Sequence, residues 1–422
     1  MRVGIVGGGI TGLALTHALA RAGVDSVLFE RDEEPGGIIR SRELDGRVLE
    51  LGPQRTRLVP PIRRLVEELG LAPRLLTARP GAGLYIWRGG RLRAVPTTPA
   101  GALRSDLLSP PGRLRLMAEP LTGPLRAEES VATYFRRKAG REAYRVLLGP
   151  LVSATFASDP ERMPARHSLP LILGPLGVKR SLLAAARRRR PTGDAPACTF
   201  RDGMRELPAA LADRHPERVS LATEVVAVEP DGAAAAVRLC DGSRVRVDRV
   251  VLTTPAPVAA RLLRPVAPGA SERLAALCYH EVAIAHLAVP RTPYGFGFQV
   301  AFGETLRTRG VTWSASLFGR DPVGATAYLG GGRDPEIRAW PDARIADTAV
   351  AEYEEVHGVP ATALEVSRAA LPAYDESWAG LDGLSLPPFI RLAANYRARL
   401  GISGRIAEAE GLARALAAEA RR

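Results

Sequence analysis

Residues 3–12 of this 422-residue chain read VGIVGGGITG and decide the class of fold. The apolar run at 3–6 has the character of a buried parallel strand, and the glycines after it follow the spacing GxGxxG. A helical pattern then continues to Gly23, and 27–29 predicts a second strand that ends at Glu30. Strand, glycine turn, helix, strand and acid in this order predict a dinucleotide-binding unit.

The positions of the glycines match the needs of a bound dinucleotide. Gly7 permits a tight turn from strand to helix, Gly9 lets backbone amides approach a pyrophosphate, and Gly12 lets the helix lie close to the sheet. Ile10 and Thr11 open the helix, whose positive end attracts phosphate groups. We therefore expect all five residues to contact the cofactor.

A second glycine pair indicates which dinucleotide is bound. Glu30 lies eighteen residues after the last glycine of the turn, close to the place of the carboxylate that binds ribose hydroxyls. Arg31 and Gly36-Gly37 follow, a pattern that nicotinamide enzymes do not need. It is typical of FAD proteins of the amine-oxidase and glutathione-reductase types, in which these residues touch the rest of the cofactor. Gly52-Pro53 comes where the chain would pass the flavin ring, so the sequence predicts FAD.

Composition excludes several classes of protein. Three isolated cysteines rule out a disulfide scaffold, and 46% hydrophobic residues supply a sizeable core. The net charge is +13, but only two of the 58 basic residues are lysines, and the chain has one asparagine and two glutamines. This skew is typical of a GC-rich genome, and the arginines are scattered, so nucleic-acid binding is not predicted. The positive charge favours acidic small molecules and anionic membrane surfaces.

The sequence also predicts where the protein is located in the cell. No apolar run reaches the ~18 residues that span a bilayer, and glycines interrupt the first apolar run, so no secretory signal is predicted. We expect a cytoplasmic protein, with peripheral contact at the inner face of the membrane left open.

The six histidines lack metal-ligand spacing, and no nucleophile constellation stands out. No metal and no catalytic side chain are predicted, since a flavin itself accepts hydride.

The predicted fold class is α/β: a Rossmann-like FAD-binding domain, an antiparallel-sheet substrate domain and a helical, membrane-facing insertion. The FAD-binding domain is expected to be discontinuous, over 1–58, 196–265 and 385–422. The substrate domain is expected over 80–98 and 270–380, and the helical domain over 101–195.

Four further stretches resemble the oxygen-dependent protoporphyrinogen oxidase family, which includes a coproporphyrinogen III oxidase branch. Residues 149–160 read GPLVSATFASDP, similar to the family's PL-x-SG-x-YAGDP, and 200–208 resemble its F-x-GG-x-x-x-LP. Residues 248–256 are similar to the strand that returns to the nucleotide domain, and 392–396 (LAANY) resemble the AGNY before the final flavin helix. Ile38 stands where related amine oxidases usually have arginine, which favours the porphyrinogen branch.

The resemblance implies an FAD-dependent oxidase of haem biosynthesis that converts a porphyrinogen to the porphyrin, with O2 as acceptor giving H2O2. It implies an adenine contact at Val225 and flavin contacts at Asn395, Tyr396 and the backbone of Leu400. The sequence departs from the family motif at Ala394 and Arg399, where the family has glycine.

A porphyrinogen is a large apolar macrocycle with propionate groups, so its site needs an apolar slot and arginines at the rim. The resemblance implies a propionate contact at Arg104, with Arg55 or Arg57 as rivals. It places Phe296 and Phe298 against the macrocycle, and Gln299 follows them in the same stretch.

Two other readings stay open. The same fold serves FAD amine oxidases and carotenoid desaturases. The altered carboxyl-terminal motif also allows a non-catalytic homologue that binds porphyrin or flavin without turnover. The residues do not separate protoporphyrinogen IX from coproporphyrinogen III, and they do not predict the oligomeric state.

Overall fold

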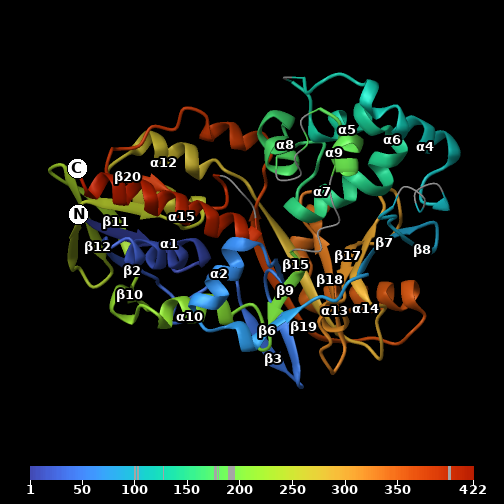
Figure 1. The fold of residues 1–422 in the computed structure, drawn as a ribbon, viewed down its shortest axis with the longest axis horizontal. Coiled ribbons are helices and arrows are strands. Elements are labelled where there is room, and N and C mark those ends of the chain that lie inside the picture. The colour runs from blue at the N-terminus through green and yellow to red at the C-terminus, as the bar shows by residue number, and fades with distance from the viewer. Residues whose placement is uncertain are drawn as a thin grey trace.

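The structure is a computed structural model that describes residues 1–98, 101, 104–126, 128–174, 178, 180–188, 195–397 and 401–422. Figure 1 shows three regions. A nucleotide-binding region contains both ends of the chain, a large sheet lies on the other side of the molecule, and a helical region lies above that sheet in this view.

A five-stranded parallel sheet forms the nucleotide-binding region. Its order is β10-β2-β1-β14-β20, in which the first strand of the chain is central and the last is at an edge. The strands are β1 (Arg2–Val6), β2 (Asp25–Phe29), β10 (Val219–Ser220), β14 (Arg249–Leu252) and β20 (Ile390–Leu392). Strands covered on both faces are apolar throughout, which explains the unbroken run at 3–6.

Helices cover one face of this sheet and a β-meander covers the other. On the first face α1 (Ile10–Arg21) and α15 (Gly401–Ala420) lie side by side (Figure 1). They share a hydrophobic core with α2 (Pro60–Glu68) and α10 (Glu206–Asp213). The opposite face carries the antiparallel strands β11 (Val225–Asp231), β12 (Ala234–Leu239) and β13 (Arg244–Val247), with α11 (Ala256–Leu263) and α12 (Pro268–Ala275).

The large sheet has seven strands in the order β19-β15-β18-β17-β16-β7-β8. Only β16 and β7 are parallel neighbours. Its strands are β7 (Gly83–Arg88), β8 (Arg91–Ala94), β15 (Tyr279–Ala288), β16 (Gly295–Val300), β17 (Thr308–Thr312), β18 (Gly324–Gly330) and β19 (Thr362–Pro372). One face packs on α14 (Asp342–His357) in a separate hydrophobic core. The short helices α13 (Ser314–Phe318) and η5 (Pro335–Ala339) lie in its connections, and η6 (Glu376–Leu381) follows β19 on the way to β20.

Two small sheets connect the nucleotide-binding region to the large sheet. One is the hairpin of β3 (Ser41–Leu44) and β4 (Arg47–Glu50). The other has β9 (Ala197–Phe200) between β5 (Thr56–Arg57) and β6 (Leu75–Thr77). The single-turn helix η1 (Ala72–Arg74) precedes β6, whereas η4 (Pro216–Arg218) precedes β10 of the parallel sheet.

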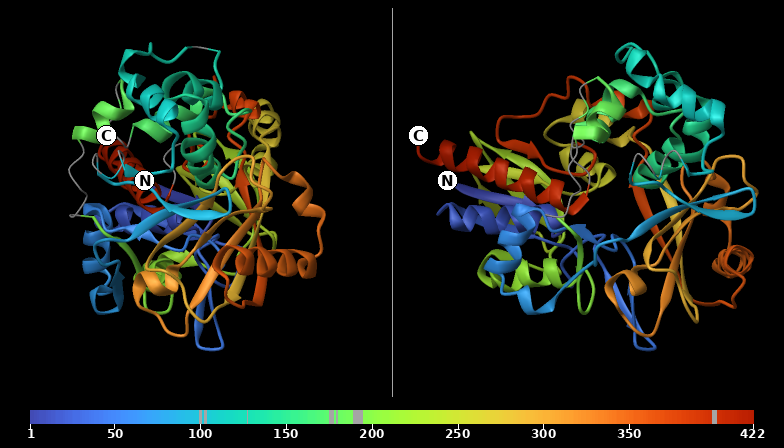
Figure 2. Two further views of the ribbon diagram at one scale, coloured as in Figure 1. Left: turned by 90° about the vertical axis from the view of Figure 1, so that its right-hand side faces the viewer. Right: turned by 45° about the vertical axis from the view of Figure 1, so that its right-hand side comes forward.

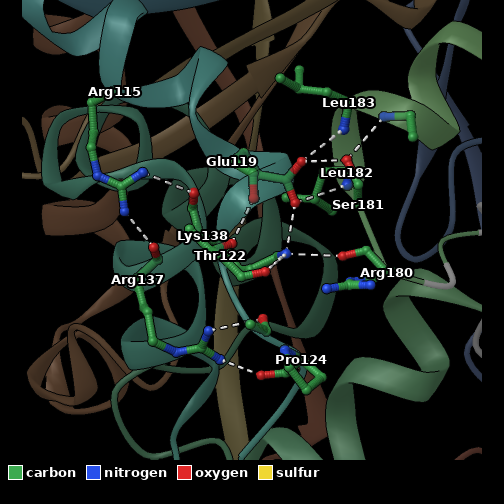
Figure 3. Close-up of polar contacts among 12 residues, drawn as sticks. Arg115, Glu119, Thr122, Pro124, Arg137, Lys138, Arg180, Ser181, Leu182 and Leu183 are labelled. Carbon is green, nitrogen blue, oxygen red and sulfur yellow. Dashed lines mark hydrogen bonds and ion pairs between the residues drawn. The ribbon is translucent and has the colours of Figure 1, made fainter.

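The helical region lies over the end of the large sheet, and the right-hand view of Figure 2 shows it well apart from the blue N-terminal part of the chain. It consists of α4 (Pro110–Met117), η2 (Glu119–Leu121), α5 (Val131–Ala139), α6 (Arg141–Ala143), η3 (Tyr144–Leu148), α7 (Gly149–Phe156), α8 (Ala165–Leu173) and α9 (Leu182–Arg188). A fully buried ion pair, Lys138 with Glu119 at 2.9 Å, ties α5 to η2 and to the residues before α9 (Figure 3).

The predicted α/β class, with a nucleotide-binding region and a largely antiparallel second sheet, is confirmed. The second strand is longer than expected and begins at Asp25. Among the described helices none is long and apolar enough to cross a bilayer. The domain boundaries and the membrane-facing role of the helical region stay predictions.

Candidate flavin and substrate site

The turn between β1 and α1 leaves the start of the helix without a side-chain cap. Gly7 has φ +110°, in the left-handed region that favours glycine. A Cβ on Gly12 would overlap the carbonyl oxygen of Gly7, so α1 lies this close to β1 only because residue 12 is glycine. Gly9 is the N-cap, and a Cβ there would meet no described atom within 4 Å. The start of α1 therefore has room beside Gly9, as a bound anion needs.

Glu30 supplies a buried carboxylate beside this turn. Its Oε2 accepts a hydrogen bond from the backbone N–H of Gly8 at 2.5 Å, and its Oε1 accepts one from that of Asp32 at 3.0 Å. The N–H of Thr223 donates to the Glu30 carbonyl at 2.7 Å, which brings the first residue of β11, the buried Val225, to the same corner. Two backbone donors leave the carboxylate with acceptor capacity for ribose hydroxyls.

The second glycine pair packs on the first turn. The N–H of Gly36 donates to the carbonyl of Gly8 at 2.8 Å, and Gly36 forms a parallel bridge with Gly9. A Cβ on Gly37 would lie 3.4 Å from the Cα of Gly9. The pair predicted from the sequence to touch the cofactor thus lies against the pyrophosphate turn.

The chain passes this turn a second time after β4. A Cβ on Gly52 would overlap the carbonyl oxygen of Ile38, so Gly52-Pro53 runs directly beside the glycine pair. Ile38 is 49% exposed, although most large apolar side chains of the described residues are buried. Arg31 is also exposed and lies 3.4 Å from Asp32. An apolar ring bound here would cover Ile38, which is consistent with a flavin.

The carboxyl-terminal motif lies at the end of the parallel sheet. The hydroxyl of Tyr374 donates to the carbonyl of Asn395 at 2.9 Å, and the indole N–H of Trp378 donates to that of Tyr396 at 2.6 Å. The Tyr396 ring is fully buried, and its hydroxyl has no partner among the described residues. Ala394 is buried, whereas Arg399 and Leu400 lie outside the described residues.

On the large sheet, strand register brings polar side chains together on one face. Gln299 of β16 is opposite Gly310 of β17, which is opposite Tyr328 of β18. Thr312 lies two residues further along β17 and therefore shares their face. Phe298 points to the opposite face, into the core.

Gln54 joins this sheet face to the nucleotide-binding region. It follows Gly52 by two residues and is buried, and its Oε1 accepts hydrogen bonds from the hydroxyls of Thr312, at 2.6 Å, and Ser314. Burial raises the pKa of the Tyr328 hydroxyl, and Thr312 and Gln54 oppose this shift. The segment at 52–54, which passes the turn between β1 and α1, is thus fixed on one face of the seven-stranded sheet.

Arg55 brings a positive charge to the same place. Its guanidinium lies 5.1 Å from the ring centre of Phe296, and that of Arg57 lies 6.0 Å from the same ring. Burial lowers the pKa of Arg55; Tyr328 opposes this shift and Arg57 adds to it. No carboxylate of the described residues pairs with Arg55. A half-buried guanidinium without a counter-ion, over an aromatic ring, suits a carboxylate on an apolar ligand.

The other predicted substrate residues are placed differently. Phe298 is 1% exposed and packs against the rings of Trp313 and His357, at 6.2 and 5.5 Å. The register of β16 on β7 shifts between residues 295 and 297, which separates Phe296 from Phe298. Arg104 is exposed at the start of the helical region. The structure therefore brings Arg55 to Phe296 and leaves Phe298 in the core.

Sequence reasoning missed Gln54, Thr312 and Tyr328. Gln54 could have been found from the sequence, because Gln54 and Gln299 are the only glutamines in a chain whose composition disfavours amides. Both lie at this site. Thr312 and Tyr328 carried no such signal, since only strand register places them on the shared face.

Glu50, two residues before Gly52, is buried and fixes this part of the chain through several polar contacts. Its carboxylate accepts hydrogen bonds from the hydroxyl of Ser41 at 2.6 Å and from the backbone N–H of Met204 at 3.0 Å, and Arg320 lies 3.8 Å away. Burial raises the pKa of Glu50 to about 7, against the opposing effects of Ser41 and Arg320. The folded protein therefore favours the protonated carboxyl more than the unfolded chain does.

This raised pKa predicts a pH dependence of stability. The contribution of Glu50 is fully present below the unfolded value of 4.5 and is lost as pH rises toward 7, by up to about 3 kcal/mol. Glu50→Gln should lack this loss, so its stability relative to the wild type should rise over that range. Urea unfolding across the pH range measures the difference, with exposed Glu355→Gln as control. A difference that does not change with pH would contradict the assignment.

A parallel sheet with an uncapped glycine turn, a carboxylate after the second strand and a second chain segment beside the turn defines a dinucleotide-binding flavoprotein. The uncapped helix end, the buried Glu30 and the exposed Ile38 fit the pyrophosphate, ribose and ring of FAD. Residues 10–398 match the model of the flavin containing amine oxidoreductase family. The chain belongs to this family, and its cofactor is FAD, as predicted from the sequence.

Individual relatives are more distant. The chain is 28% identical to protoporphyrinogen oxidase 1, chloroplastic, of Spinacia oleracea, over 79% of this chain and 67% of that one. It is 26% identical to coproporphyrinogen III oxidase of Mycobacterium leprae, over 99% and 98%. A crystal structure of a candidate protoporphyrinogen oxidase from Exiguobacterium sp. 255-15 superposes with a TM-score of 0.80 at 23% identity, over 99% of both chains. The resemblance inferred from the motifs is confirmed.

Proposed function

We propose that this protein oxidises a porphyrinogen, protoporphyrinogen IX or coproporphyrinogen III, to the porphyrin, with O2 as acceptor giving H2O2. The observation that carries the proposal is the Arg55 guanidinium, which lies over Phe296 and pairs with no carboxylate of the described residues, two residues after Pro53. The relatives named as porphyrinogen oxidases support it.

The residues of this face suit such a substrate. A porphyrinogen presents an apolar macrocycle edged with propionates, and Arg55 with Arg57 supplies positive charge beside the apolar Phe296 ring. Gln54 accepts hydrogen bonds from the hydroxyls of Thr312 and Ser314, which fix the sheet face against the segment at 52–54. Gln299 lies on the same face and is half-buried.

FAD, when bound, supplies the hydride acceptor. The chain's own residues bind the macrocycle, orient it and anchor its carboxylates. Each round removes one hydride and one proton from the substrate, and O2 takes up two electrons and two protons to leave as H2O2. Three rounds with tautomerisation give the aromatic porphyrin. No side chain of the chain needs to form a covalent bond to the substrate.

Anaerobic mixing of the FAD-loaded protein with coproporphyrinogen III tests the proposal. Loss of the flavin's visible absorption before O2 is admitted, followed by enzyme-dependent porphyrin fluorescence after O2 is admitted, is the expected result. A flavin spectrum that stays unchanged both with coproporphyrinogen III and, in a second experiment, with protoporphyrinogen IX would overturn the proposal.

Arg55→Met should weaken substrate binding more than turnover. Loss of a charged hydrogen-bond partner for a carboxylate costs about 1.5–3 kcal/mol, so KM should rise about 10- to 100-fold with a smaller change in kcat. Steady-state kinetics on both porphyrinogens measure the effect. Exposed Arg201→Met serves as a charge-matched control, and equal effects of the two substitutions would contradict the assignment of Arg55.

The proposal includes peripheral membrane association through the segment 110–126. Four exposed apolar side chains gather there: Leu114, Met117, Leu121 and Leu125, which are 71%, 62%, 89% and 40% exposed. Two charged side chains of the segment, Arg115 and Glu119, turn inward, whereas Arg126 is exposed. Arg115 donates to backbone carbonyls of α5, and the one carboxylate, Glu119, is buried against Lys138 (Figure 3). An apolar surface without exposed acid fits an anionic bilayer.

Leu121→Glu should reduce binding to lipid vesicles at least several-fold, because it places a charge at the most exposed apolar position. Co-sedimentation with phosphatidylcholine vesicles, with and without phosphatidylglycerol, measures the effect. Ala343→Glu adds the same charge on exposed α14 and should leave binding unchanged. Absence of wild-type binding to both kinds of vesicle would overturn the membrane proposal and leave the oxidase proposal intact.

A further inference from the structure

Two histidines meet on the outer side of the nucleotide-binding region, away from the glycine turn. His17 lies on α1, one turn before its end, and His215 follows α10. Their ring nitrogens, Nδ1 of His17 and Nε2 of His215, are 3.0 Å apart. The pair borders an open pocket of about 350 Å³ that is also lined by Ala20, Arg21, Glu68 and Arg214.

A carboxylate lies behind each imidazole. Nε2 of His17 is 2.8 Å from Oε2 of Glu68, at the end of α2, and Nδ1 of His215 is 3.9 Å from Oε1 of Glu217. A carboxylate accepts a hydrogen bond, so Glu68 fixes the proton of His17 on Nε2 and leaves the lone pair of Nδ1 facing His215. Arg21 holds the other oxygen of Glu68 at 2.7 Å.

The facing nitrogens of the two rings are at hydrogen-bond distance from each other. In a neutral pair one shared proton occupies the space between the two facing nitrogens. Metal-binding histidines in proteins commonly have a carboxylate at the far ring nitrogen, as His17 has in Glu68.

We propose that His17 and His215 bind one divalent transition-metal ion, of the Zn²⁺ class, between Nδ1 and Nε2. The ion takes the place of the shared proton, and the proton of His215 moves to Nδ1, on the side of Glu217. Neutral imidazole is a preferred ligand for Zn²⁺, Cu²⁺ and Ni²⁺.

The geometry requires little movement. At zinc–nitrogen distances of about 2.0–2.1 Å, tetrahedral coordination separates the two nitrogens by roughly 3.3 Å, so they must part by about 0.3 Å and both rings must turn toward the ion. Within the described part of the chain no group of three or more histidine, cysteine or acidic residues is arranged to hold a metal. The two histidines therefore take their remaining ligands from water in the open pocket.

The sequence did not predict this site because its two ligands are 198 residues apart and neither has a neighbouring ligand at metal-binding spacing. The site lies beside α1, whose other end faces the pyrophosphate turn. Since the ligands come from two separate segments, a bound ion would link α1 to the turn after α10 and raise the midpoint of thermal unfolding.

Calorimetric titration of untagged, FAD-loaded protein with Zn²⁺ tests the proposal. We expect one equivalent to bind, and binding to be lost in His17→Gln and in His215→Gln. Glu68→Gln should weaken it about 10- to 100-fold, the usual effect of removing the partner behind a ligand. His167→Gln is the matched control, because that histidine is also half-buried beside a carboxylate, Asp382 at 3.4 Å, and should leave binding unchanged.

Two outcomes would overturn the proposal. One is the absence of stoichiometric Zn²⁺ binding to the wild type. The other is binding that persists in His17→Gln/His215→Gln, which would assign the ion to other groups such as the exposed Cys240 and Cys278. Retention of FAD and an unchanged circular dichroism spectrum in each variant show that loss of binding does not come from misfolding.

Discussion

Replacing Lys138 with methionine is expected to lower the free energy of unfolding by about 3–5 kcal/mol. The Lys138 side chain is fully buried, and its ammonium lies 2.9 Å from Glu119 and donates to the carbonyl of Arg180 at 2.9 Å (Figure 3). Burial alone would raise the pKa of Glu119, but hydrogen bonds from Ser181 and Lys138 hold it below its usual range. Without the lysine, a carboxylate stays buried with no cation beside it.

A second substitution separates the charge from the packing. In Lys138→Met/Glu119→Gln both charges are gone, and the amide oxygen still accepts from the backbone of Leu182, so most of the lost stability should return. Arg136→Met is the matched control on the same helix. It breaks an exposed pair with Glu161 and should cost less than about 1 kcal/mol. Chemical unfolding of the four proteins measures these values, and equal losses for Lys138→Met and Arg136→Met would contradict the account.

Gly12→Ala is expected to weaken FAD binding at least about 100-fold, or about 2.7 kcal/mol. A Cβ at this position would overlap the carbonyl oxygen of Gly7, and Oγ1 of Thr253 is only 3.0 Å away. Helix α1 would have to move from β1, and the amides of its first turn would move with it. Apoprotein titrated with FAD, followed by flavin fluorescence, measures the change.

Gly411→Ala supplies the control for this substitution. Gly411 also lies in a helix, α15, but a Cβ there meets only Arg414, at 3.8 Å. This change should leave FAD affinity unchanged and stabilise the helix by up to about 1 kcal/mol. Wild-type FAD affinity in Gly12→Ala would show that close contact at this glycine does not position the cofactor cradle.

The nucleotide-binding part of the fold could be predicted almost completely from the sequence. The glycine spacing has a single structural purpose, and an apolar strand next to it leaves few alternatives. Glu30 lies where the spacing predicts, and Gly36 packs on the first turn. A single sequence shows this turn because its close backbone contacts require glycine, and the spacing of the glycines can be read directly.

The substrate face was less predictable, because it depends on contacts between distant segments. Gln54 is hydrogen-bonded to Thr312, which is 258 residues away in the chain. A shift in strand register separates Phe296 from Phe298, although residues two positions apart in a strand usually share a face. Arg104, matched by motif alone, is exposed. Long-range pairing and a local bulge, which carry no sequence signature here, decide which side chains face the flavin cradle.

Aerobic turnover of the purified, FAD-loaded protein on freshly reduced coproporphyrinogen III and protoporphyrinogen IX tests the central proposal most directly. Porphyrin fluorescence and peroxide are followed together against a blank without enzyme. The account predicts enzyme-dependent porphyrin with about three peroxides for each porphyrin formed, and the ratio of the two rates identifies the preferred substrate. Porphyrin formed no faster than in the blank, with FAD bound, would contradict the account and direct attention to amines or carotenoids as substrates.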